Sequence, residues 1–127
     1  MAKVDEAARR RYAEDRERAQ RLPELLEAVA LAEQALEEAH AAGAGTEELH
    51  RCGVALDAAL TEAMRAAYAE ERVRIGPRGY NDRIYRRKRL AKPGIREATE
   101  VAERLLTARE AHRLHGIVRV PRSPVPA

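Results

Sequence analysis

The helical organisation of this chain is encoded most clearly in residues 22–66, which read LPELLEAVALAEQALEEAHAAGAGTEELHRCGVALDAALTEAMRA. Apolar residues recur there at alternating spacings of three and four, on both sides of a Gly-Ala-Gly interruption at 43–45. This spacing places apolar side chains along one stripe of a helix. The glycines of the interruption tolerate positive φ and allow one helix to end before the next begins. The stretch therefore predicts two antiparallel helices that form a hairpin.

The predicted contact between these two helices is a coiled-coil-like seam. Its large members are Leu22, Leu25, Val29 and Leu36 in the first helix, and Leu49, Cys52 and Leu56 in the second. Most of the remaining seam positions are alanine, which allows close approach but buries little apolar area. Gly53, which is unfavourable inside a helix, indicates a close backbone contact at that position. Because the seam is thin, we expect a third helix or another chain to cover the hairpin.

The two limbs of the hairpin differ in length. The second limb continues without a breaker to Ile75, and Thr46 is its expected N-cap. The first limb spans only about 20 residues between Pro23 and the turn. The C-terminal third of the second limb can therefore pair only with the segment before Pro23. Pro23 either opens a new helix at its first position or kinks one that runs through it, and both readings place a joint at residues 21–23. The difference in length favours a helix from about residue 5 with a kink at Pro23.

Glycine and proline also divide the chain beyond the hairpin. Residues 76–79, Gly-Pro-Arg-Gly, end the long helix, and Asn81 or Asp82 is suited to cap a short basic helix over 83–90. The spacing of apolar residues predicts a last helix over 95–115 that packs on the hairpin. Three prolines then predict an extended tail over 117–127.

The predicted fold class is therefore all-α, with a single helical domain over residues 1–116. Its expected parts are a helical hairpin at about 5–75, a basic segment at 72–96, a C-terminal helix at 95–115 and an extended Pro-rich tail at 117–127.

Composition limits the kind of protein further. The chain has 127 residues, which suffice for one domain. Its 12 Leu, 4 Ile and 8 Val, against 26 Ala, predict a thin core. No apolar run approaches the roughly 20 residues of a membrane span, and the charged N-terminus lacks the apolar stretch of a signal peptide. The single Cys52 agrees with a reducing compartment. We expect a cytoplasmic protein with no membrane association.

Charge is segregated along the chain, although the formal net charge is only +3. Residues 23–71 carry two arginines against eleven acids, whereas residues 72–96 carry ten Lys and Arg side chains against a single acid, Asp82. Blocks of opposite sign indicate separate partners, or partnership with each other.

The basic segment is the strongest candidate binding region. Its candidate contact residues are Arg72, Arg74, Arg78, Tyr80, Arg83, Tyr85, Arg86, Arg87, Lys88, Arg89, Lys92 and Arg96. Dense positive charge suits phosphate, and the tyrosine rings could stack on unpaired bases. An acidic protein surface is the alternative partner, including the acidic hairpin of the same or a neighbouring chain. A solvated face without a partner is the third reading.

Two wider interpretations of the function remain open. The first is non-enzymatic binding within a larger assembly, through contact of the basic segment with nucleic-acid backbone or with an acidic partner. The second is a structural subunit of a homo- or hetero-oligomeric particle, such as a virus or mobile-element component, whose acidic hairpin and basic limb interlock between copies. Glutamates on the last helix argue against a helix-turn-helix that reads bases, because acids facing phosphate are repelled.

The sequence gives little support to catalysis or to a bound cofactor. Ser123 is the only serine and lies in the tail, and no Gly-rich phosphate loop precedes a helix. The four histidines and Cys52 do not form a set with zinc-like spacing. We therefore expect no enzyme activity, no metal, no cofactor and no small-molecule substrate.

Overall fold

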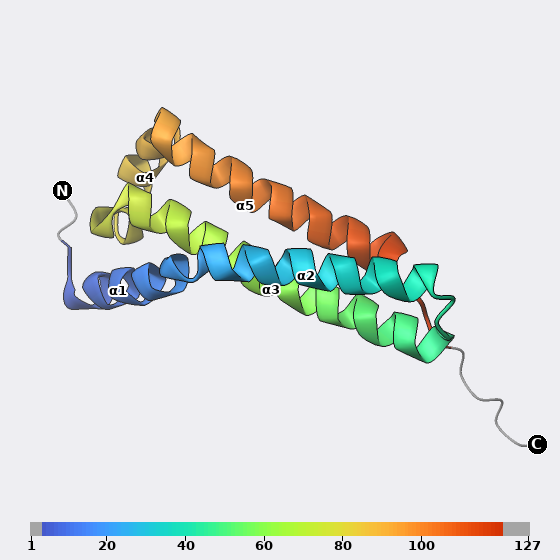
Figure 1. Cartoon of the computed structure of the whole chain (residues 1–127). Helices are drawn as coiled ribbons and strands as arrows, with labels where there is room; N and C mark the ends of the chain where they lie inside the picture. The colour runs from blue at the N-terminus through green and yellow to red at the C-terminus, as the bar shows by residue number, and fades with distance from the viewer. Residues whose placement is uncertain (1–3, 121–127) are drawn as a thin grey trace, which may run out of the picture.

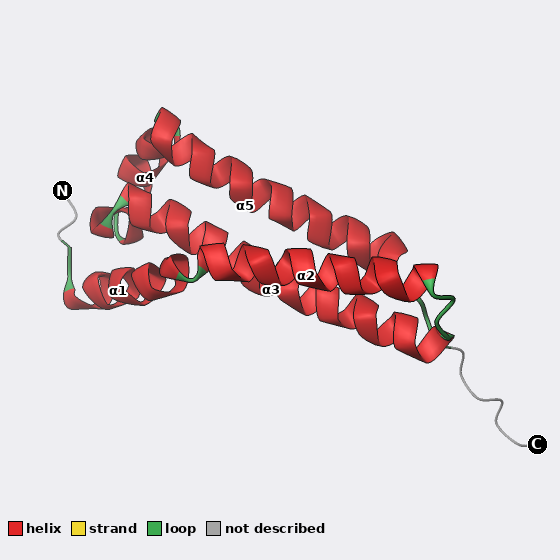
Figure 2. Cartoon of the chain, in the orientation of Figure 1, coloured by secondary structure: helices red, strands yellow, loops and turns green. Residues whose placement is uncertain are grey.

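The computed structural model describes residues 4–120 and is all-α (Figure 1). Its elements are α1 (Glu6–Gln20), α2 (Leu22–Ala41), α3 (Thr46–Ile75), the 3-10 turn η1 (Pro77–Tyr80), α4 (Arg83–Leu90), α5 (Pro93–Ala111) and the π-helical turn η2 (His112–Gly116). No residue of the described part lies in a β-strand (Figure 2). The predicted fold class is confirmed, although most of the expected tail, residues 121–127, lies outside the described residues.

The long helix α3 is the spine of the molecule. It packs against α1 and α2 on one side and against α5 on the other, and Figure 1 shows α1 and α2 following one another along its length. Because α3 spans 30 residues and α2 only 20, the C-terminal part of α3 is left for α1, as the difference in length predicts. The expected third helix is α5.

The joint between α1 and α2 corrects one detail of the prediction. We expected one helix kinked at Pro23, whereas α1 ends at Gln20 and a separate helix begins at Leu22. Proline has no N–H to donate to the carbonyl four residues earlier, and its ring crowds that carbonyl. The N–H of Arg21 instead donates to the Arg18 carbonyl at 3.1 Å, which closes α1.

The hairpin turn lies where the Gly-Ala-Gly interruption predicts it. Gly43 has a φ of +67°, and the N–H of Ala44 donates to the Ala39 carbonyl at 2.9 Å, a glycine-dependent way to end a helix. The N-cap of α3 is Gly45, not the expected Thr46. The backbone of Gly45 is already extended, and its carbonyl accepts from the Leu49 N–H at 3.0 Å, so Thr46 is the first helical residue.

The core confirms the centre of the predicted seam and extends it. The buried cluster consists of Val29, Leu56, Leu60 and Ala63, with Leu25, Ala32, Leu36, Ala59 and Leu105 packed against it. Leu22, Leu49 and Cys52 are half-buried and lie outside this cluster. The burial of Leu60 was not predicted. The predicted seam follows a single stripe of α3, whereas α3 packs against α1 and α2 and also against α5. Fully buried alanines such as Ala102 allow the helix axes to approach closely.

The close backbone contact predicted at Gly53 is confirmed, and its partner is the C-terminal end of the described chain. A Cβ at position 53 would lie 3.3 Å from the Cα of Ile117. Two histidine rings hold this crossing in place: His112 Nε2 lies 2.7 Å from the Gly53 carbonyl oxygen, and His50 Nδ1 lies 2.6 Å from that of Val118. The first residues of the expected tail are therefore packed against α3.

Candidate functional site

The basic segment folds into the last turn of α3, η1, α4 and the start of α5, at the end of α3 away from the hairpin turn (Figure 1). Asp82 caps α4, because its Oδ1 accepts from the Tyr85 N–H at 2.9 Å. Arg78 pairs with the other carboxylate oxygen at 3.2 Å and stacks on the Tyr85 ring, 4.5 Å from its centroid. The bond from the Tyr85 N–H lowers the pKa of Asp82, and Arg78 adds to that shift. The single acid of the segment therefore serves to start its helix.

Part of the predicted binding set holds the fold together. Arg74 donates to Glu70 Oε1 at 2.8 Å and to the Gly94 carbonyl at 2.6 Å, so it links the end of α3 to the start of α5. Arg89 donates to the Arg74 carbonyl at 3.2 Å. The residues of the predicted set that have partners within the chain are Arg72, Arg74, Arg78, Tyr80, Tyr85 and Arg89.

Asp15 of α1 is the centre of the most buried polar cluster, and the sequence reasoning missed it. Its carboxylate accepts from Arg72 Nε at 2.8 Å and Arg72 Nη2 at 3.1 Å, and also from the Tyr80 hydroxyl. The Asp15 residue is only 8% exposed. This cluster joins three elements, α1, α3 and η1. It therefore fixes the position of η1 and of the end of α3, on which α4 packs.

Burial and pairing act in opposite directions on the acid of this cluster. Desolvation alone would raise the pKa of Asp15, but the hydrogen bonds from Arg72 and Tyr80 and the charge of Arg72 outweigh it, so the pKa is lowered. Burial, and then the hydrogen bond to Asp15, raises the pKa of Tyr80. At neutral pH the cluster is therefore a carboxylate, a guanidinium and a neutral hydroxyl donor.

Replacing Asp15 with Asn should destabilise the fold by about 2 kcal/mol, between the cost of breaking an exposed pair and that of breaking a fully buried one. Because folding lowers the pKa of Asp15 below its ordinary 3.8, the carboxylate's contribution is complete above that value and is lost as pH falls through the folded value. Urea unfolding of both proteins from pH 7 to pH 3 checks this prediction. The difference between wild type and variant should shrink on acidification.

The matched control is Asp57→Asn, because Asp57 receives a similar two-point contact from Arg113, whose side chain is 48% exposed. Solvent screens this pair, so its loss should cost less than the loss of Asp15. Equal losses in the two variants would contradict the structural role given to the Asp15 cluster.

The other cationic side chains of the basic segment have no hydrogen-bond or ion-pair partner within residues 4–120. They belong to Arg83, Arg86, Arg87, Lys88, Lys92 and Arg96, all of them exposed. Arg83, Arg86 and Arg87 fall on one face of α4, since they are spaced three and four residues apart. They line a depression of about 670 Å³ together with Asn81, Asp82, Ile84 and Leu90. We call these three arginines the α4 basic face.

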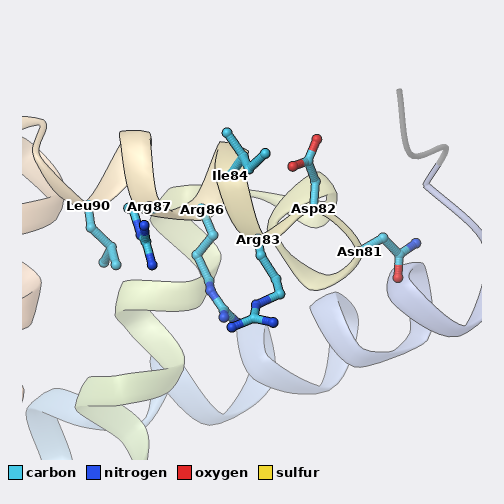
Figure 3. A pocket seen from close by; sticks show the side chains of 7 residues that line it. All are labelled: Asn81, Asp82, Arg83, Ile84, Arg86, Arg87 and Leu90. Carbon is cyan, nitrogen blue, oxygen red and sulfur yellow. The ribbon is translucent and has the colours of Figure 1, made fainter.

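Figure 3 shows how this face is presented. The side chains of Arg83 and Arg86 run side by side, and Arg87 and Leu90 extend from the same side of the helix, whereas Asp82 and Ile84 point the other way. No acid occurs between residues 83 and 96. The guanidinium groups of the α4 basic face are therefore not neutralised by neighbours along their own helix.

Within the chain, the basic helix contacts only one limb of the acidic hairpin. In the described part α4 packs on η1, on α3 and on α5 and makes no contact with α2. The reason is topological: α1 occupies the part of α3 that lies nearest to α4. The five glutamates of α2 therefore remain exposed at a distance from the basic segment.

Within residues 4–120 no three His, Cys, Asp or Glu side chains converge as metal ligands would. Nor does this part of the chain contain a helix both long and apolar enough to cross a membrane.

No protein-family model matches this chain, and no curated protein or solved structure is significantly similar to it.

Proposed function

We propose that this is a non-enzymatic, cytoplasmic protein that binds nucleic-acid backbone through the α4 basic face, as part of a larger assembly. The observation that carries the proposal is that the side chains of Arg83, Arg86 and Arg87 are exposed on one face and have no hydrogen-bond or ion-pair partner within residues 4–120. Lys88, in the same helix, adds a fourth exposed cation.

Phosphate is the partner chemistry that suits this face best. Arginine presents a planar fork of donors that matches the oxygens of a phosphate, and it keeps its charge at every physiological pH. Side chains three and four residues apart have Cβ atoms about 5–6 Å apart, so neighbouring arginines are able to contact one strand together. Each such contact releases counterions from the nucleic acid, which favours binding at low salt.

The proposed binding is insensitive to base sequence. The rings of the two tyrosines that could stack on bases already contact arginines of the same chain. Arg11 lies 5.1 Å from the Tyr80 ring centroid, and Arg78 lies over the Tyr85 ring. The acids of α5, including the exposed Glu97 and Glu100, would oppose placing that helix in a groove. Contacts to phosphate should therefore dominate over contacts to bases.

Fluorescence anisotropy with labelled oligonucleotides tests this function. We expect single- and double-stranded DNA and RNA to bind with a Kd of roughly 1–100 µM at physiological salt, with little dependence on sequence, as is typical of backbone binding. Polyglutamate of matched charge, added as competitor, should displace the oligonucleotide only weakly. If polyglutamate displaces the oligonucleotide at an equal concentration of charge, the acidic-protein partner is favoured. If neither polymer binds at low salt, the proposal is refuted.

The structural-subunit function remains the second candidate, and the separation of charge in the fold favours it. The exposed acids of α2 lie away from α4, so the acidic helix of one copy could meet the basic helix of another without folding back on itself. A contact between two different surfaces forms rings or open chains. Under this function, sedimentation velocity should show larger species as concentration rises at low salt, and these should dissociate at high salt.

A further inference from the structure

A small cavity that shares Arg86 with the α4 basic face collects arginines from three separate helices. It has a volume of about 130 Å³ and lies where α1, the end of α3, η1 and α4 meet. Its lining residues are Arg11, Arg72, Ile75, Gly76, Gly79, Tyr80 and Arg86. Of these arginines, only Arg72 and Arg86 belong to the basic segment, because Arg11 comes from the helix before Pro23.

The arginines of this cavity are held in different ways. Arg72 is fixed by Asp15, which accepts from its Nε at 2.8 Å and from its Nη2 at 3.1 Å, and the side chain of Arg72 is still 36% exposed. Asp15 neutralises the charge of Arg72 but blocks only one edge of its guanidinium. Arg11 lies over the Tyr80 ring, and Arg86 is exposed; neither has an acidic partner in the described chain. Two uncompensated positive charges and one fixed donor edge therefore border the same space.

Two residues that line this space must be glycine. Gly76 has a φ of +101°, a conformation that side chains other than glycine's rarely adopt. At Gly79, a Cβ would overlap the side chain of Ile75. The two glycines therefore form a wall without side chains, and that wall depends on the close packing of η1 against α3.

We infer that this cavity binds a single phosphate group, with Arg11 and Arg86 on either side of it and Arg72 as a pre-oriented donor. The volume is well below the roughly 300 Å³ at which pockets for drug-sized ligands begin, so a tetrahedral oxyanion suits it better than a nucleobase does. The inference rests on the proposed function in one respect: the physiological source of the phosphate is a nucleic acid lying on the α4 basic face. Arg11 of α1 then becomes part of the same interface.

Nuclear magnetic resonance of ¹⁵N-labelled protein, titrated with inorganic phosphate at constant ionic strength, tests the site. The amides of Gly76 and Gly79 should shift and saturate in wild type. Both Arg11→Gln and Arg86→Gln should weaken phosphate binding at least fivefold, because each removes one of the two uncompensated charges. Arg51→Gln, which removes an exposed arginine elsewhere on α3, should leave binding unchanged. An unchanged amide spectrum outside the cavity shows that each variant is folded.

Oligonucleotides with and without a 5′-phosphate identify the source of the phosphate. Tighter binding of the phosphorylated strand, lost in Arg11→Gln, would assign the cavity to a strand end. Equal binding of both strands, weakened in Arg11→Gln, would assign it to an internal phosphate.

The two proposals fail separately. If phosphate does not shift Gly76 and Gly79 while oligonucleotides still bind through the α4 basic face, the cavity inference is wrong and the proposed function stands. If phosphate binds in the cavity while oligonucleotides do not bind at all, the anion site stands and its nucleic-acid source is refuted.

Discussion

Replacing Arg83, Arg86 and Arg87 together with Gln is expected to weaken oligonucleotide binding about a hundredfold at 50 mM salt. If each arginine makes one phosphate contact that contributes about 1 kcal/mol, the loss is about 3 kcal/mol, which corresponds to roughly two decades in Kd. Glutamine keeps most of the length of the side chain and its hydrogen-bonding capacity, so the change reports mainly on charge. Fluorescence anisotropy under identical conditions measures the ratio of the two affinities.

The matched control for this variant removes the same charge elsewhere. Arg51, Arg65 and Arg104 are exposed on α3 and α5, and changing all three to Gln lowers the net charge by the same amount. If binding depends on the α4 basic face, the control should lose far less affinity than the α4 variant. Equal losses in both would show that only the net charge of the protein matters, and the proposed interface would be wrong.

Leu60→Ala is the substitution with the largest expected effect on stability. Leu60 is 3% exposed and packs with Val29, Leu56 and Ala63 in the buried cluster. Truncating such a leucine typically costs 2–5 kcal/mol, through lost transfer free energy and the cavity left behind. We expect about 3 kcal/mol in urea unfolding. Because the core consists mostly of alanine, few other side chains compensate, and the variant should melt well below the wild type.

Leu31→Ala provides the comparison, since Leu31 of α2 is 67% exposed. Substitutions at exposed sites usually change stability by less than about 0.5 kcal/mol. A loss at Leu31 as large as that at Leu60 would show that the outer face of α2 is covered in solution. That outcome would contradict a self-sufficient core and favour the structural-subunit function.

The sequence predicts the elements of this fold better than it predicts their joints. The Gly-Ala-Gly turn, the short helix capped by Asp82 and the last helix all follow from local signals, which depend only on residues near each helix end. The break after Gln20 was read as a kink, and Gly45 displaced Thr46 as N-cap. Both errors concern a single residue whose backbone conformation is determined by the packing of the two helices it connects.

The Asp15 cluster could not be predicted from the spacing of apolar residues. Ala8, Tyr12, Asp15 and Ala19 are spaced by four, three and four residues, so the apolar seam of α2 continues backwards through α1. This signal is present in the sequence, but the acid Asp15 interrupts the apolar stripe. The partner of Asp15 is Arg72, 57 residues later in the chain, and no local pattern pairs residues so far apart.

The sequence predicts the candidate site as a continuous segment, and only the fold shows which of its cations are paired within the chain. Arg72 and Arg83 look alike in the sequence, since both belong to the block of ten cations. In the fold, Arg72 is committed to Asp15 and Arg83 is free for a partner. Arg11 was outside the predicted segment altogether, and only the packing of α1 against η1 brings it to the cavity that Arg86 also lines.

The most direct test of the α4 basic face is the salt dependence of duplex DNA binding, measured for wild type and for the variant with Gln at 83, 86 and 87. Each neutralised phosphate contributes about 0.9 to the slope of log K against log salt. If all three arginines contact phosphate, the variant's slope should be shallower by about 2.7. Equal slopes in the two proteins would mean that these arginines make no phosphate contacts, which would contradict the proposed interface.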